Sequence, residues 1–336
     1  MPPAYAKKSA TVIVVRPLQK EFTDAAEGLE DHIDYDFRLV PFFLSKQDRR
    51  RQNVKMKRFH QLVETEQPSM FVLMNNYSVE FMRHFQETYP TYRKVPCLVM
   101  MAVFAEKAVS RLPNATGIQY EVPAVTNLVN LRSLMKQPVQ RVGVVYRPHL
   151  RRFIAEQKAL CAKELISLTG IEVQNGWGMP RRIRSALKTL IEDHEVDALW
   201  VINDSELLSK RLIRRAWNPA LKHFKSPVVT SLENFVSNPN LMGSFAVVPD
   251  HYELGRQASD LLSKVKRSHW RAGNLPMRYP FSVRKIVNLD KINAEVLIRK
   301  RALMEMDQVI STQPESMLSP KDGSKLSATL TNARRP

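Results

Sequence analysis

The chain has 336 residues, of which 44% are hydrophobic and 25% are charged, a mixture that suits two globular domains of ordinary size. No apolar run reaches the roughly 18 residues of a membrane-spanning helix, so the sequence predicts no such helix. The formal net charge of +18 makes nucleic acid, anionic lipid or an acidic ligand candidate partners.

The N-terminal residues 1–10 contain no apolar stretch that could form the core of a signal peptide. Two alternatives stay open: the chain works in the cytoplasm, or a leader has been removed from it.

The first half of the chain alternates apolar runs with stretches of helical periodicity. Helices are expected over 22–33, 54–63 and 79–85, between strands over 10–15, 36–40, 70–74 and 95–101. This alternation indicates a parallel sheet with helices on both of its faces.

The second half repeats the plan. Strands are expected over 141–146, 171–174, 198–202 and 227–230, with helices over 153–168, 183–191 and 207–216. Gly170 would end the helix over 153–168, as glycine often does.

Three local matches relate the two halves. Val14–Pro17 resembles Val145–Pro148, Leu73–Asn76 resembles Val201–Asp204, and Lys94–Pro96 resembles Lys225–Pro227, at offsets of 131, 128 and 131 residues. Three matches in one order at a nearly constant offset indicate a repeated unit. The predicted fold is therefore α/β, with two doubly wound parallel-sheet lobes.

About three crossings should join the lobes as a hinge, over 117–123, 246–250 and 276–283. We expect an N-terminal lobe (N-lobe) of residues 9–118 plus 249–279 and a C-terminal lobe (C-lobe) of residues 119–248 plus 280–310. The tail over 311–336 is rich in Ser, Thr, Pro, Lys and Asn and should be disordered.

Ligands of parallel sheets bind beyond the carboxyl ends of the strands, so two facing lobes predict a cleft lined by polar strand ends. The candidate ligand-binding residues are Arg16, Asn76, Tyr77, Phe104, Tyr146, Arg147, Asn203, Asp204 and Glu233.

Each candidate type has an alternative role. Arg16 and Arg147 could clamp a carboxylate with two prongs, or be solvated or form a salt bridge across the cleft. Asp204 could bind ligand, cap the following helix, or do both. The aromatic candidates could stack on a ring.

Catalytic and metal-binding patterns are missing from the sequence. There is no Walker loop, no Gly-x-Gly-x-x-Gly, no Gly-x-Ser-x-Gly and no His/Cys cluster with metal-ligand spacing. We therefore expect no enzyme activity, no cofactor and no metal. Cys97 and Cys161 should lie in different lobes and form no disulfide.

The basic residues are grouped in runs, the densest over Lys46–Arg58 and others at Arg181–Arg184, Lys210–Arg215 and Arg299–Arg301. These runs fall on several separate predicted helices, without interleaved aromatic residues. Solvated helix faces are therefore favoured, and a nucleic-acid partner is disfavoured.

Several segments carry a family resemblance: Arg141–Tyr146, Val196–Asp204 and Val248–Gln257, with Tyr252–Gln257 the most specific, and also Ala115–Ile118 and Ile286–Leu289. They resemble the ABC transporter substrate-binding family that includes tryptophan and tyrosine importer components. The resemblance covers about residues 10–305.

The resemblance implies the type I periplasmic-binding fold and capture of a small solute, such as an amino acid or an aromatic or carboxylate-bearing molecule. It also implies a membrane permease as partner and a periplasmic or cell-envelope location; we expect a monomer. Arg16–Leu18 and Ala102–Phe104 depart from the family's small polar residues, so family ligands do not carry over. The alternative is a cytoplasmic ligand sensor on the same fold.

Overall fold

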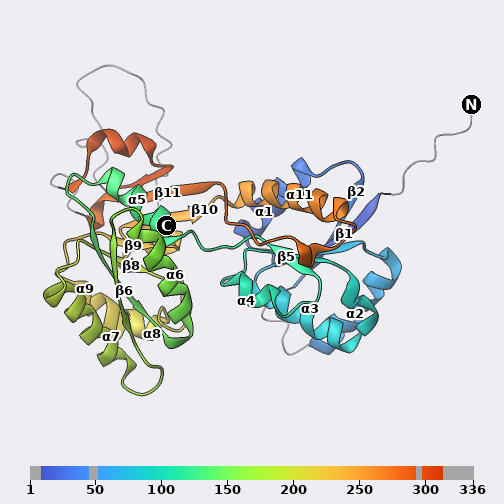
Figure 1. Cartoon of the computed structure of the whole chain (residues 1–336), viewed down its shortest axis with the longest axis horizontal. Helices are drawn as coiled ribbons and strands as arrows, with labels where there is room; N and C mark the ends of the chain where they lie inside the picture. The colour runs from blue at the N-terminus through green and yellow to red at the C-terminus, as the bar shows by residue number, and fades with distance from the viewer. Residues whose placement is uncertain (1–8, 45–51, 293–296, 313–336) are drawn as a thin grey trace, which may run out of the picture.

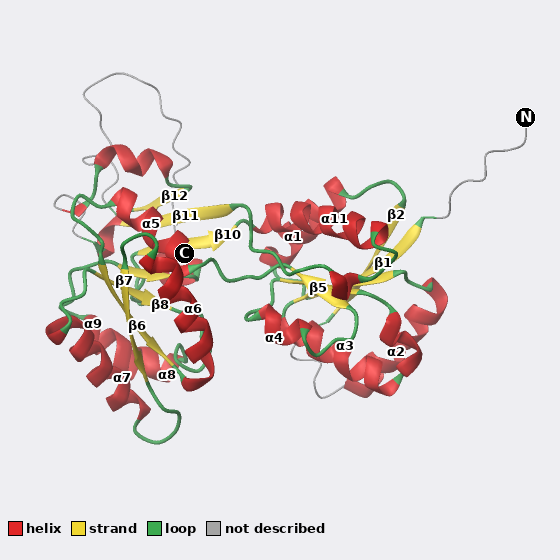
Figure 2. Ribbon diagram, viewed as in Figure 1, coloured by secondary structure: helices red, strands yellow, loops and turns green. Residues whose placement is uncertain are grey.

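The computed structural model describes residues 9–44, 52–292 and 297–312, which form two α/β lobes side by side (Figure 1). In each lobe a central sheet carries helices on both faces, as Figure 2 shows. The sequence predicted this two-lobe architecture, and the structure confirms it.

The N-lobe sheet has five parallel strands in the order β2-β1-β3-β4-β5. They are β1 (Ala10–Arg16), β2 (Phe37–Phe43), β3 (Met70–Met74), β4 (Cys97–Met100) and β5 (Ala115–Gly117). The strands β1, β3 and β4 are buried on both faces, which is why they read as unbroken apolar runs.

The N-lobe helices form two layers on the sheet. Helix α1 (Lys20–His32) lies beside α11 (His251–Arg267) on one face, and α2 (Gln52–Glu66), α3 (Asn76–Thr88) and α4 (Ala105–Val109) cover the other (Figure 1). The turns η2 (Pro90–Lys94) and η6 (Ala272–Asn274) complete the lobe. Two separate apolar clusters, one on each face of the sheet, form its core.

Helix α11 packs unusually closely on α1, although more than 200 residues separate them in sequence. A Cβ at Gly28 would collide with the Tyr252 carbonyl, and a Cβ at Gly255 would collide with the Ala25 carbonyl. The Tyr252 hydroxyl also donates a hydrogen bond to Asp31 at 2.9 Å. The Tyr252–Gln257 segment thus acts first as a packing surface.

The C-lobe sheet has seven strands in the order β12-β11-β10-β9-β8-β6-β7, and only the β10–β11 pair is antiparallel. They are β6 (Arg141–Tyr146), β7 (Ser167–Glu172), β8 (Ala198–Val201), β9 (Val228–Thr230), β10 (Phe245–Pro249), β11 (Val283–Asn288) and β12 (Gln308–Ile310).

The C-lobe helices also lie on both faces of their sheet. On one face are α5 (Ala124–Leu134) and α6 (Arg151–Ala162), and on the other are α7 (Met179–Lys188), α8 (Lys210–Leu212) and α9 (Asn218–Leu221). Helix α10 (Glu233–Ser237) and the turns η3 (Pro148–Leu150), η4 (Thr189–Asp193), η5 (Ile213–Trp217), η7 (Leu289–Lys291) and η8 (Lys300–Glu305) complete the lobe.

Three stretches of chain cross between the lobes: β5 to α5, β10 to α11, and η6 to β11. The first and third crossings are bonded together, because the Gln119 N–H donates to the Arg278 carbonyl at 2.8 Å and the Arg278 N–H donates to the Gly117 carbonyl at 3.1 Å. Gln257 of α11 donates to the Tyr279 carbonyl at 2.8 Å. Paired crossings can bend together but resist independent rotation.

One predicted boundary is wrong. Helix α6 ends at Ala162, and Gly170 lies inside β7, paired with Val144, rather than at a helix end. The chain turns at Leu165, whose φ of 57° is left-handed, and the apolar residues beyond it continue the helical spacing by coincidence. A Cβ at Gly170 would lie 2.9 Å from the Tyr146 ring, which would have to shift to accept it.

Both cysteines are buried and unpaired, Cys97 in β4 and Cys161 in α6. Residues 46–51 of the densest basic run and 313–336 of the predicted disordered tail lie outside the described residues. Thr312, at the start of that tail, donates from its N–H and its hydroxyl to Asp290 at 3.0 Å.

Candidate ligand cleft between the lobes

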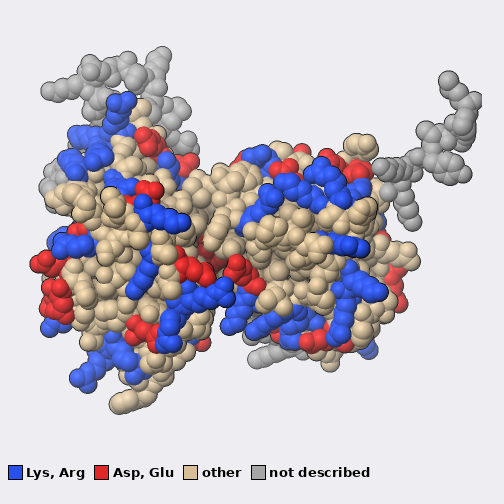
Figure 3. Space-filling view, in the orientation of Figure 1, with Lys and Arg blue, Asp and Glu red and all other residues tan. Residues whose placement is uncertain are grey.

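The carboxyl ends of both parallel sheets face the opposite lobe. The chain leaves β5 at Gly117 to enter the C-lobe and leaves β10 at Pro249 to enter the N-lobe, and the other strands that run parallel to these point the same way. Figure 3 shows a notch between the lobes with acidic and basic side chains on its walls. The fold therefore creates a cleft with two polar rims.

On the C-lobe rim, Arg147 and Asp204 form a two-pronged ion pair. Nε and Nη2 of Arg147 donate to the two carboxylate oxygens of Asp204 at 2.7 and 2.8 Å. Asp204 is only 2% exposed, and it also accepts hydrogen bonds from the N–H groups of Glu206 and Leu207 at 3.0 and 3.2 Å. The carboxylate therefore caps the turn after β8 and anchors the end of β6 at the same time.

Nη1 of Arg147 donates to Glu206 as well, at 2.8 Å. All three guanidinium nitrogens are therefore engaged by carboxylates of this lobe, so Arg147 does not present the free two-pronged clamp that the sequence offered as one alternative. His149 lies beside the pair, its Nε2 atom 4.0 Å from Asp204. Burial and the nearby Arg147 guanidinium lower the pKa of His149.

The N-lobe rim is held by weaker, neutral partners. Arg16 donates from Nη1 to the Thr23 hydroxyl at 3.2 Å, and its guanidinium lies 5.0 Å from the centre of the Phe43 ring. Asn76 is exposed and bonds twice to Val103: it donates to the carbonyl at 2.7 Å and accepts from the N–H at 2.8 Å. Both side chains stay near solvent at the mouth of the cleft.

An aromatic contact joins the two lobes. Phe104, which precedes α4 in the N-lobe, packs edge-on against Phe153 of α6, with ring centres 5.4 Å apart. Phe153 in turn lies 6.2 Å from Trp200 of β8. Phe104 itself has a left-handed φ of 53°.

The buried carboxyl of Glu121, in the first crossing, accepts a hydrogen bond of 2.5 Å from the Phe104 N–H. Burial raises the pKa of Glu121 to about 7, although the Phe104 N–H acts in the opposite direction. The first crossing thus holds the residue that makes the aromatic contact between lobes.

A hydrogen-bonded ring pair links the first crossing to the end of the second. The Tyr120 hydroxyl lies 2.9 Å from Nε2 of His251, and the rings are nearly parallel. Burial raises the pKa of Tyr120 and lowers the pKa of His251, so both favour their neutral forms. Glu233, at the start of α10, forms an ion pair with Arg284, with 3.5 Å between Oε2 and Nη1.

Three other candidates occupy different surroundings. Tyr77 is 8% exposed and packs in the apolar core beneath α3, because it lies on the sheet-facing side of that helix. Tyr146 is half-buried against Gly170 and Ile154. Asn203 is half-buried at the end of β8, beside Asp204.

Sequence reasoning missed Tyr120, Glu121, Phe153 and His251. Tyr120 and Glu121 lie in a crossing that the sequence predicted, so their position between the lobes could have marked them as candidates. Phe153 and His251 carried no local signal, because their partners lie far away in the sequence.

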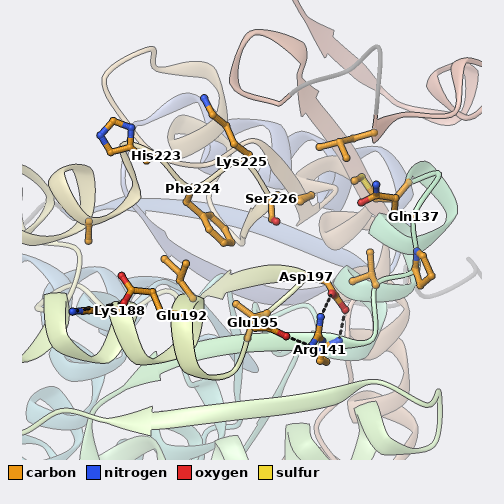
Figure 4. A pocket seen from close by; sticks show the side chains of 18 of the residues that line it. Gln137, Arg141, Lys188, Glu192, Glu195, Asp197, His223, Phe224, Lys225 and Ser226 are labelled. Carbon is orange, nitrogen blue, oxygen red and sulfur yellow. Dashed lines mark hydrogen bonds and ion pairs between the residues drawn. The ribbon is translucent and has the colours of Figure 1, made fainter.

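A separate hollow of about 740 Å³ lies away from the cleft, at the amino ends of β6, β8 and β9 (Figure 4). Its acidic residues are matched by cations: Arg141 bonds Glu195 and Asp197, and Lys188 lies 3.6 Å from Glu192. Because it opens at the end of the sheet opposite the facing rims, we do not assign the cleft's ligand to it.

Within the described residues, no helix is long and apolar enough to cross a bilayer. Nor does any group of His, Cys, Asp and Glu side chains in those residues have the grouping of a metal site.

Comparison with solved structures finds a similar architecture in several proteins. An ABC domain in complex with L-Trp from Streptococcus pneumoniae is 17% identical, with a TM-score of 0.55, over 90% of this chain and all of that one. A ligand-free, open substrate-binding protein with adhesive properties from Clostridium difficile is 12% identical, with a TM-score of 0.58, over 92% of this chain and 98% of that one.

An arabinose-binding protein from Geobacillus stearothermophilus is 11% identical, with a TM-score of 0.50, over 83% of this chain and 97% of that one. The chain has the type I periplasmic-binding fold. No family model and no curated protein sequence matches it. At these identities the likeness establishes the fold, and the function has to be argued from the cleft.

Proposed function

We propose that this protein captures a small molecule in the interlobe cleft, without catalysis, and delivers it to the permease of an ABC importer. The observation that carries the proposal is that two parallel sheets present polar carboxyl ends to each other across a bonded hinge. Closure of such a cleft excludes water and strengthens the polar contacts inside it. The solute-binding proteins that share the fold support the same function.

The ligand contacts divide between the rims. Arg16, Asn76 and Phe104 would contribute from the N-lobe, and Tyr146, Asn203 and Glu233 from the C-lobe. The Arg147–Asp204 pair would act as a rigid wall, because its charges already neutralise each other. We leave Tyr77 out, since its ring lies in the core.

The chemistry of these residues favours a ligand with a planar ring and one anionic group. The half-buried Phe104 ring at the seam offers an edge or face for stacking. Arg16 engages its neighbours through Nη1, so its guanidinium can still turn Nη2 toward an anion. A carboxylate on an aromatic or amino-acid skeleton meets both conditions.

Thermal-shift screening against amino acids, aromatic acids and nucleobases tests this directly. A ligand present at about 100 times its Kd should stabilise the protein by about 2.7 kcal/mol. Arg16→Ala should then weaken binding of the responding compound about tenfold, whereas Lys57→Ala, on the exposed surface of α2, should leave affinity unchanged. The proposal fails if no compound raises the melting temperature, or if both variants bind equally well.

A further inference from the structure

A second surface of the C-lobe, away from the cleft, is rich in exposed cations. Residues 173–191 and 207–232 contain no Asp or Glu, and they form α7 and the α8–η5–α9 unit. These helices pack side by side, with Nη1 of Arg184 donating to the Arg215 carbonyl at 2.7 Å. We call the exposed cations on them the basic face: Arg181, Arg184, Lys188, Lys210, Arg211, Arg214, Arg215, Lys222 and Lys225.

The sequence had placed these cations on separate helices, which favoured independent solvated faces. The structure brings two of these runs together, because α7 lies against η5 and α9 in one layer. Figure 3 shows Lys and Arg side chains over α7 at the lower end of this lobe. Among the described residues of the basic face, Lys188 alone has an ion pair, with Glu192 at 3.6 Å.

Helix stability accounts for only part of this charge, such as Lys188 in the last turn of α7. The first turn of α7 carries Arg181 and no acid, although a cation at a helix N-terminus is unfavourable. Like charges four residues apart repel each other, and three such pairs occur: Arg184 with Lys188, Lys210 with Arg214, and Arg211 with Arg215. The fold therefore tolerates a cost that binding of a polyanion would remove.

An exposed indole marks one end of the basic face. Trp177 is 99% exposed in the loop between β7 and α7, flanked by Gly176 and Gly178 with φ values of 102° and 83°. An indole beside lysines and arginines is the composition of segments that rest at the headgroup level of a membrane. Single-stranded nucleic acid would instead favour a groove with repeated aromatic residues.

We propose that the basic face docks the protein on a bilayer containing anionic phospholipids, with Trp177 at the headgroup level. Attraction to an anionic surface corresponds to about a fivefold gain in partitioning for each cation near it. The docking does not depend on the solute in the cleft. It would confine the protein to the plane of the membrane and shorten its search for a membrane partner.

Co-sedimentation of the full chain with vesicles tests the proposal. We expect binding to vesicles of phosphatidylglycerol and phosphatidylcholine, no binding to pure phosphatidylcholine, and release as salt rises from about 0.1 M to about 1 M. R211E/R215E should lower partitioning more than tenfold. The matched reversal K57E/R58E, on exposed α2 residues of the N-lobe, should lower it less than threefold.

Tryptophan fluorescence supplies an independent readout. Emission should shift to shorter wavelength when anionic vesicles are added, and Trp177→Ala should abolish the shift while weakening partitioning several-fold. Equal losses for the two charge reversals would mean that net charge alone drives binding and would overturn the proposal. So would an absence of binding to anionic vesicles, or tighter binding of the basic face to single-stranded nucleic acid than to vesicles.

Discussion

On the C-lobe side of the cleft, Arg147 and Asp204 form an ion pair shielded from water, with two hydrogen bonds at 2.7 and 2.8 Å. On the N-lobe side, Arg16 and Asn76 bond to a hydroxyl and to backbone groups close to solvent. Arg16 and Arg147, at equivalent positions where the first strand of each lobe ends, therefore serve different purposes.

This difference shows how one fold can combine a rigid binding rim with an adjustable one. A charge pair in a poorly hydrated place keeps its geometry whether or not a ligand is present, because separating it would expose an uncompensated charge. Exposed single hydrogen bonds exchange easily with water. The C-lobe rim is thus preformed, and the N-lobe rim is the side that can adjust to a ligand.

The largest effect is expected at the preformed rim. Asp204→Ala leaves the Arg147 guanidinium without its two-pronged partner and removes the cap after β8, so we expect a loss of about 3 kcal/mol in the free energy of unfolding. Urea denaturation measures it. Glu206→Ala is the matched control, because Glu206 binds the same guanidinium while its side chain is 63% exposed, and it should cost under about 1 kcal/mol. Equal losses would show that the pair is not shielded.

The hinge should give stability a pH dependence through Glu121. Its pKa is raised from 4.5 to about 7, so the folded state keeps a proton that the unfolded state releases between these values. The contribution of Glu121 to the free energy of unfolding should therefore be greatest below about pH 4.5. It should fall by roughly 3 kcal/mol as the pH rises to about 7.

Glu121→Gln separates this charge effect from the hydrogen bond. The amide oxygen can still accept from the Phe104 N–H, but the side chain no longer ionises. Urea midpoints across that pH range should then be flat where the parent protein declines. A variant that keeps the parent's slope would assign the decline to another group.

The contact between α1 and α11 should be intolerant of a single methyl group. Gly255→Ala places Cβ inside the Ala25 carbonyl, so the helices must separate, at a cost of about 1–3 kcal/mol. Gly273→Ala is the control, since the nearest atom to its Cβ would be 3.8 Å away. Thermal unfolding of the two variants should differ clearly, and similar melting temperatures would contradict the close packing.

Much of the fold could be predicted because buried parallel strands leave a strong pattern. Met70–Met74 and Ala198–Val201 are fully buried and read as short apolar runs, each followed by polar residues that end the strand. The repeat of Val14–Pro17 at Val145–Pro148 added the duplication. Local signals of this kind survive without knowledge of tertiary contacts.

The pairing of the site residues could not be predicted in the same way. Arg147 and Asp204 are 57 residues apart, and they meet because β8 is the neighbour of β6 in the sheet, an order that local patterns do not encode. Phe104 and Phe153 also meet only through tertiary packing, because they come from different lobes. The sequence therefore predicted the strand ends at which polar groups gather. It did not predict which of those groups form ion pairs with each other.

The smallest expected effect is at the adjustable rim. Asn76→Ala removes two bonds to Val103, both near solvent, so the free energy of unfolding should fall by only about 1 kcal/mol. Asn53→Ala, at an exposed site of α2, should change nothing measurable.

The informative readout for Asn76→Ala is hydrogen exchange over 101–105, because the lost clamp should speed local opening there without speeding exchange in β3. A cost as large as that of Asp204→Ala, or exchange that rises across the whole N-lobe, would mean that the two rims are equally rigid. Faster exchange confined to the segment before α4 would instead place the freedom needed for ligand fitting beside Phe104, where the lobes touch.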